Sequence, residues 1–136
     1  MKPILYMVDD ETDFQTIIRS WLEPLYSIVA LKDGDELIGA FKTGRPDLVM
    51  LDLKLPGADG FELCRRIRKT PGCERVPVLF LTGSHEFADY RQNMRAGGNA
   101  YITKPVGRRQ LLAVIADLLQ EAKVVVPHTV DTGGGD

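Results

Sequence analysis

Five short apolar runs alternate along this chain with segments whose apolar residues recur at helical spacing. A short apolar run that stops at polar residues is typical of a strand buried on both faces, whereas a stripe with a 3.6-residue period is typical of an amphipathic helix. The expected strands are residues 4–8, 26–31, 48–51, 76–81 and 100–103, and the expected helices cover about 13–23, 34–42, 60–69, 87–96 and a last stretch around 111–119. The alternation predicts an α/β domain with a five-stranded parallel sheet and helices on both of its faces.

The alternation ends before the chain does. Its 136 residues suit one domain with a single hydrophobic core. Residues 124–136 begin with three valines and a proline and include three consecutive glycines, a composition typical of a linker. We therefore expect one folded domain over residues 1–123 and a flexible linker or tail over residues 124–136.

Composition excludes several classes of protein. There are 17 basic against 19 acidic residues, and the net charge of −2 argues against a dedicated nucleic-acid binder. Cys64 and Cys73 have neither the spacing of a zinc site nor that of a disulfide framework, so we expect free thiols in a reducing compartment. No apolar run is long enough to cross a bilayer. These features predict a cytoplasmic protein that contacts neither membrane nor nucleic acid directly.

Polar side chains follow four of the five expected strands: Asp9 and Asp10, Asp52, Thr82, and Lys104. In open parallel sheets the ligand site lies at the carboxyl ends of the strands, so we expect these residues to meet at one edge. Three crowded carboxylates repel one another unless a cation offsets their charge, and Mg²⁺, or Mn²⁺, prefers such oxygen ligands. An ammonium and a hydroxyl beside them suit phosphoryl transfer, which depends on positioning and electrostatic stabilisation.

Four stretches carry a resemblance to a known family: VDDE at residues 8–11, PDLVMLDLKLPGADGFEL at 46–63, PVLFLTG at 77–83 and AGGNAYITKP at 96–105. Together and in this order they resemble the receiver domain of response regulators, the CheY-like family of two-component signalling. The resemblance covers roughly the first 120 residues. It implies a doubly wound, flavodoxin-like (βα)5 fold with strand order 2-1-3-4-5, which is that family's known order.

The resemblance also implies a role for each residue of the metal and phosphoryl site. Asp52 resembles the phosphoacceptor. Asp10 resembles a direct metal ligand, Asp9 a ligand that acts mainly through water, and the Lys54 backbone carbonyl a further ligand. Thr82 and Lys104 would then bind the phosphoryl oxygens.

Four further positions resemble regulatory or structural features of the family. Tyr101 resembles the switch aromatic, which turns inward when the threonine at the end of the fourth strand moves toward the phosphate. Lys54 and Ser84 occupy the positions that tune the lifetime of the phosphate. Pro105 is a candidate for a cis peptide bond. Gly98–Asn99 departs from the commoner Ala–Asp pair, and we expect little effect on the chemistry.

The implied function is that of a phosphoacceptor signalling module rather than a general enzyme, since it would catalyse only its own phosphorylation and dephosphorylation. A sensor histidine kinase or phosphotransfer protein would donate the phosphoryl group. Phosphorylation would shift an existing equilibrium and alter the surface of the fourth helix, fifth strand and fifth helix, through which a homodimer or an effector would bind. The chain could be a stand-alone receiver or part of a longer regulator.

Two other functions compete with this one. A Mg²⁺-dependent phosphatase with an aspartate nucleophile uses similar groups, but its nucleophile normally lies in an Asp-x-Asp motif after the first strand, where this chain has adjacent Asp9 and Asp10. A receiver-fold scaffold that works without phosphorylation would not need the intact acidic set. Separately, the basic residues of helix 60–69 form a solvated helix face, with partner recognition as the alternative.

Overall fold

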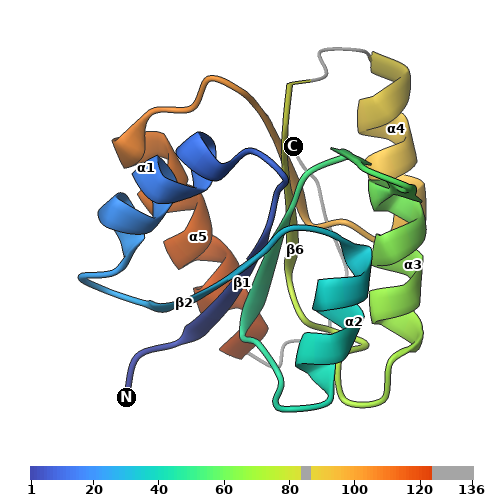
Figure 1. Cartoon of the computed structure of the whole chain (residues 1–136), viewed down its shortest axis with the longest axis horizontal. Helices are drawn as coiled ribbons and strands as arrows, with labels where there is room; N and C mark the ends of the chain where they lie inside the picture. The colour runs from blue at the N-terminus through green and yellow to red at the C-terminus, as the bar shows by residue number, and fades with distance from the viewer. Residues whose placement is uncertain (84–86, 124–136) are drawn as a thin grey trace.

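A computed structural model of the chain, which describes residues 1–83 and 87–123, has a five-stranded parallel sheet with helices on both faces (Figure 1). Its strands are β1 Ile4–Val8, β2 Ser27–Leu31, β3 Leu48–Leu51, β6 Val78–Thr82 and β7 Ala100–Thr103. They are ordered β2-β1-β3-β6-β7, and every neighbouring pair is parallel. Counted along the chain within this sheet, the order is 2-1-3-4-5, which confirms the expected fold class.

Five helices cover the sheet: α1 Thr12–Leu22, α2 Gly34–Phe41, α3 Gly60–Lys69, α4 Phe87–Ala96 and α5 Arg108–Lys123. Alternate residues of each strand point to opposite faces, so the core is divided in two. Leu5 and Met7 of β1 pack with the apolar sides of α1 and α5. Tyr6 and Val8 pack on the other face with α2 and α3. Figure 1 shows α1 and α5 on one side of the sheet and α2, α3 and α4 on the other.

A small hairpin between the third strand and third helix was not predicted from the sequence. It pairs β4 Lys54–Leu55 with β5 Ala58–Asp59 in antiparallel register. Two-residue strands are too short to show an alternating apolar pattern, which is why periodicity does not reveal them. Gly57 reverses the chain with a φ of 68°, a conformation that glycine adopts without steric cost.

The ends of several elements differ slightly from the sequence expectations. β2 begins one residue later than predicted, and β6 covers 78–82 rather than 76–81. No helix in the described part of the chain is long and apolar enough to cross a membrane. The linker or tail expected at residues 124–136 lies outside the described residues.

Candidate functional site

Three of the functional candidates lie one residue beyond the ends of their strands, at the carboxyl edge of the sheet. Asp9, Asp52 and Lys104 directly follow β1, β3 and β7. Each donates its backbone N–H to the last residue of a neighbouring strand: Asp9 to the Leu31 carbonyl at 3.0 Å, Asp52 to Val8 at 3.0 Å and Lys104 to Thr82 at 2.7 Å. The sheet's own hydrogen bonding therefore fixes where these three side chains begin.

Three carboxylates meet at this edge, as the sequence predicts. Asp9, Asp10 and Asp52 each place one oxygen within 4.8 Å of the others. Asp9 and Asp52 are buried, whereas Asp10 is exposed. Burial raises the pKa of Asp9, although hydrogen bonds from Lys104 and the Glu11 N–H act in the opposite direction. An all-oxygen anionic group of this kind fits a hard divalent cation such as Mg²⁺.

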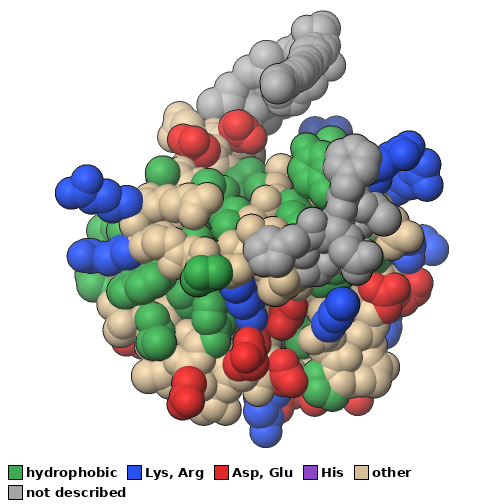
Figure 2. Space-filling view, turned by 90° about the horizontal axis from the view of Figure 1, so that it is seen from above, with side chains coloured by type: hydrophobic (Ala, Val, Ile, Leu, Met, Phe, Trp, Pro, Cys, Tyr) green, Lys and Arg blue, Asp and Glu red, His purple; other side chains and the backbone are tan. Residues whose placement is uncertain are grey.

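Lys104 is the cation that this acidic group surrounds. Its Nζ lies 2.9 Å from Asp9 Oδ2, 2.8 Å from Glu11 Oε1 and 3.5 Å from Asp52 Oδ2. Burial lowers the pKa of Lys104, but the hydrogen bonds to the two carboxylates and the nearby charge of Asp52 raise it by more, so the net shift is upward. The ammonium therefore stays charged at neutral pH. Figure 2, which looks down on the carboxyl edge, shows acidic side chains next to basic ones near the middle of this face.

Glu11 belongs to this group, although sequence reasoning assigned it no role. It occupies the N-cap position of α1 but makes no side-chain capping bond there, because its carboxylate binds Lys104 instead. The same hydrogen bond lowers the pKa of Glu11. The signal that could have revealed it is its position directly after two aspartates at the same strand end. Phe14, one helical turn further on, presents its ring 4.1 Å from Lys104 Nζ in a cation–π contact.

Thr82 and Tyr101 lie on neighbouring strands of the sheet. Thr82 ends β6 and is buried. Tyr101 lies opposite Phe80 in the β6–β7 register, and its partly buried ring packs 6.4 Å from the Phe80 ring and 6.0 Å, edge to face, from the ring of Tyr90 in α4. The tyrosine thus connects the strand that carries Thr82 with α4.

Of the two positions expected to tune phosphate lifetime, Lys54 and Ser84, the structure describes only Lys54. Lys54 begins the β4–β5 hairpin, and its backbone N–H donates to Asp52 Oδ1 at 3.3 Å. Its side chain is exposed and lines a pocket of about 410 Å³ together with Asp59 and Gln92. Ser84 lies outside the described residues. The peptide bond between Lys104 and Pro105 is cis.

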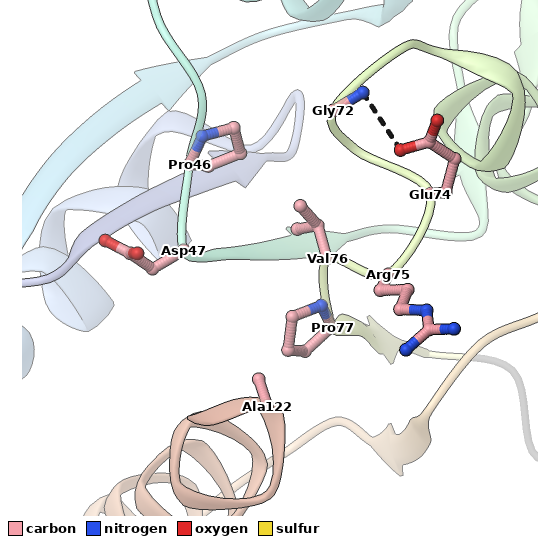
Figure 3. Close-up of a pocket in the computed structure, with 8 residues that line it drawn as sticks. All are labelled: Pro46, Asp47, Gly72, Glu74, Arg75, Val76, Pro77 and Ala122. Carbon is pink, nitrogen blue, oxygen red and sulfur yellow. Dashed lines mark hydrogen bonds between the residues drawn. The ribbon is translucent and has the colours of Figure 1, made fainter. Parts of the chain in front are cut away.

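A pocket of about 440 Å³ at the opposite edge of the sheet contains none of these residues (Figure 3). The segments that enter β3 and β6 line it together with α5, and they contribute Asp47, Glu74 and Arg75. Glu74 accepts a hydrogen bond from the Gly72 N–H at 2.9 Å. The candidate site is therefore the carboxyl edge and not this pocket.

Comparison with known proteins adds the family context. The profile of the response regulator receiver domain matches residues 5–116. The phosphate regulon transcriptional regulatory protein PhoB of Rhizobium meliloti is 34% identical over 131 residues, which make up 96% of this chain and 58% of PhoB. The transcriptional regulatory protein ResD of Bacillus subtilis is 36% identical over 119 residues, or 87% of this chain and 48% of ResD. The chain spans about half the length of these curated relatives.

Solved structures of a response regulator and of a receiver domain have the same fold as this chain. A putative response regulator from Chloroflexus aurantiacus superposes with a TM-score of 0.84 at 27% identity, covering 88% of this chain and 99% of that one. The receiver domain of a sensor histidine kinase from Pseudomonas aeruginosa superposes with a TM-score of 0.80 at 28% identity and the same coverage. In that structure a magnesium ion is coordinated in the active site cleft.

Proposed function

The chain belongs to the response regulator receiver family, the phosphoacceptor signalling modules of two-component systems, and on this premise we propose that Asp52 is the residue that accepts the phosphoryl group. The observation that carries the proposal is the strand order. β3 lies between β1 and β6, so Asp52 has the acidic pair Asp9 and Asp10 on one side and Thr82 on the other. Its Oδ2 also lies 3.5 Å from the ammonium of Lys104.

We further propose that Mg²⁺ binds to Asp9, Asp10, Asp52 and the backbone carbonyl of Lys54, with Mn²⁺ as a substitute of similar ligand preference. The close approach of the three carboxylates supports this assignment, as does the magnesium ion in the cleft of the Pseudomonas aeruginosa relative. The ion would supply positive charge that offsets the carboxylates and the phosphoryl oxygens.

The remaining groups position the phosphoryl group. A carboxylate oxygen of Asp52 attacks phosphorus, the bond from phosphorus to the donor imidazole nitrogen breaks, and the imidazole keeps the electron pair. Lys104 and the Thr82 hydroxyl bind phosphoryl oxygens and stabilise their charge. The donor would be a sensor histidine kinase or a phosphotransfer protein, because the chain belongs to the receiver family of two-component systems.

We propose that the signal leaves through α4, β7 and α5. Thr82 would move toward the phosphoryl group and Tyr101 would turn inward behind it, which changes the surface offered to a second copy or an effector. The packing of Tyr101 between Phe80 and Tyr90 of α4 supports a link from strand to helix. Lys54, and Ser84 beyond the described residues, would tune how long the phosphate lasts.

The test is phosphorylation by a small-molecule donor. Incubation with acetyl phosphate and Mg²⁺ should add the mass of one phosphoryl group, and EDTA should prevent it. Asp52→Asn should abolish the mass gain, whereas Asp35→Asn, an equal change of charge in the first turn of α2, should retain it. Labelling of the Asp52→Asn variant at the normal rate would contradict the assignment.

The same experiment separates the alternatives. A receiver is labelled stoichiometrically and hydrolyses its own phosphate, whereas a phosphatase with an aspartate nucleophile turns over many phosphomonoesters. A scaffold that works without phosphorylation need not bind Mg²⁺ at all. Membership of the receiver family favours the first behaviour.

A further inference from the structure

Another pocket lies between α2 and α3, near their C-terminal ends. It measures about 400 Å³ and is lined by Ile38, Phe41, Lys42, Arg66, Lys69 and Thr70. We call it the α2–α3 pocket. Gly60, at the other end of α3, is the residue that approaches Asp52, and Figure 1 shows α2 and α3 side by side with their C-terminal ends pointing away from the carboxyl edge. The pocket is therefore separate from the proposed phosphorylation site.

The floor of the α2–α3 pocket is apolar and anchored to the core. Ile38 and Phe41 are partly buried, and Phe41 packs against the core face that contains Tyr6, with the two ring centroids 5.9 Å apart. A bulky apolar side chain that entered the pocket would remove more of this surface from water, which favours binding. Because α2 and α3 hold both walls, the pocket is preformed.

Three of the four polar residues that line the rim of the pocket are cationic, and the fourth is the neutral Thr70. Lys42, Arg66 and Lys69 are exposed, and within the described residues none of them has an ion-pair partner. The adjacent Arg65, by contrast, pairs with Glu62 at 3.3 Å. Basic residues are favourable at helix C-termini, but that preference does not account for three unpaired cations around one apolar pocket that has no carboxylate in its lining. The pocket in Figure 3 differs, since acidic and basic residues both line it.

We propose that the α2–α3 pocket binds an acidic segment of a partner protein, which inserts an apolar side chain against Ile38 and Phe41 while its carboxylates pair with the cationic rim. The combination of one charge sign with an apolar floor selects this chemistry over a nucleic acid, which would require a broader basic surface. This interaction goes beyond phosphoryl transfer. It would allow a partner to hold the domain while Asp52 stays accessible.

The probe is a fluorescein-labelled peptide of about 12 residues, with two leucines one helical turn apart among glutamates and aspartates. Fluorescence anisotropy with the full chain should show saturable binding that weakens as salt rises. Two control peptides, one with serine for leucine and one with glutamine and asparagine for the acids, should each bind about tenfold more weakly. NMR shift changes should centre on the pocket.

Variants of the chain locate the interaction. The triple change Lys42→Gln, Arg66→Gln and Lys69→Gln should weaken binding of the acidic peptide about tenfold. A charge-matched control at exposed cations elsewhere, Lys32→Gln with Arg91→Gln and Arg109→Gln, should bind as the natural chain does. Ile38→Gln tests the apolar floor separately, with circular dichroism to show that the fold is retained.

The outcomes separate this proposal from the function proposed above. Asp52→Asn should bind the peptide normally, and the triple variant of the rim should be phosphorylated normally. The proposal would be overturned if the acidic peptide did not bind, or if the triple variant and its charge-matched control lost peptide binding equally. Tighter binding of a DNA duplex of equal charge would also overturn it.

Discussion

Replacing Lys104 by methionine is expected to tighten Mg²⁺ binding while destabilising the metal-free domain. Methionine keeps an apolar stem of similar length beside Phe14 but removes the charge that now lies within 3.5 Å of three carboxylates. Without metal, the acidic side chains at this edge would repel one another with no internal cation to offset them. With metal, the ion would no longer share its ligands with a neighbouring positive charge.

The size of both effects follows from the distances. Two unit charges about 4 Å apart interact by about 1 kcal/mol in water and by about 4 kcal/mol at an effective dielectric constant of 20. This site lies between the two limits because Asp9 is buried while Asp10 and Glu11 are exposed. We therefore expect the metal-free variant to lose about 1–4 kcal/mol in its free energy of unfolding. Its Mg²⁺ dissociation constant should fall by at least about fivefold.

Urea unfolding followed by the fluorescence of Trp21, the chain's one tryptophan, measures the stability in EDTA and in rising Mg²⁺. The stabilisation by metal should be larger in the Lys104→Met variant, because a ligand that binds only the folded state stabilises it more when its dissociation constant is lower. Titration calorimetry gives the affinity directly. Lys69→Met, at the far end of α3, is the control and should change neither quantity appreciably.

If Lys104→Met binds Mg²⁺ more weakly than the natural chain, or equally well, then the lysine does not compete with the metal for the same carboxylates. The ion pairs of Lys104 would then have no bearing on how this site binds Mg²⁺.

Three further predictions concern positions where packing is tight. Gly98→Ala should cost about 1–3 kcal/mol, because its Cβ would overlap Asn93 Oδ1, a buried oxygen with no hydrogen-bond partner among the described residues. In an Asn93→Ala background the cost should shrink, and a double-mutant cycle in urea measures the coupling. Gly60→Ala should slow phosphorylation and lower the melting temperature, since its Cβ would lie 2.8 Å from Leu53 Cα, directly after the proposed phosphoacceptor. Burial raises the pKa of the Cys64 thiol, so iodoacetamide at pH 8 should alkylate it only on unfolding, and stability should fall as pH rises through that raised pKa.

Periodicity in the sequence predicts the main elements because each strand and helix is defined by neighbours a few residues away. The apolar run Leu48–Leu51, buried throughout, and the stripe of α3 are both local patterns. The gathering of the three aspartates with Lys104 also follows from local information, since strand ends share an edge in any open parallel sheet. The roles of these residues in metal and phosphoryl binding are still predictions.

Features that depend on distant pairs could not be predicted in this way. Glu11 and Lys104 lie 93 residues apart in sequence, and no periodic pattern connects them. No periodic pattern indicates that position 98 needs a glycine, but in the folded chain the Asn93 side chain occupies the space that a larger residue would need. Both cases require knowledge of which side chains face each other across elements.

The hydrogen bonds that tie Asp9, Asp52 and Lys104 to neighbouring strands also determine which changes of chain length the domain can accept. The position of each of these residues is set by the backbone hydrogen bonds between neighbouring strands, which continue to the last residue of each strand. An insertion in the turn that follows α2 would leave that pairing unchanged. A single residue added within β3 would instead turn the Asp52 side chain to the opposite face of the sheet, because side chains alternate with a period of two. Strand length is therefore the quantity that this fold must conserve, whereas the turn that follows α2 can change in length.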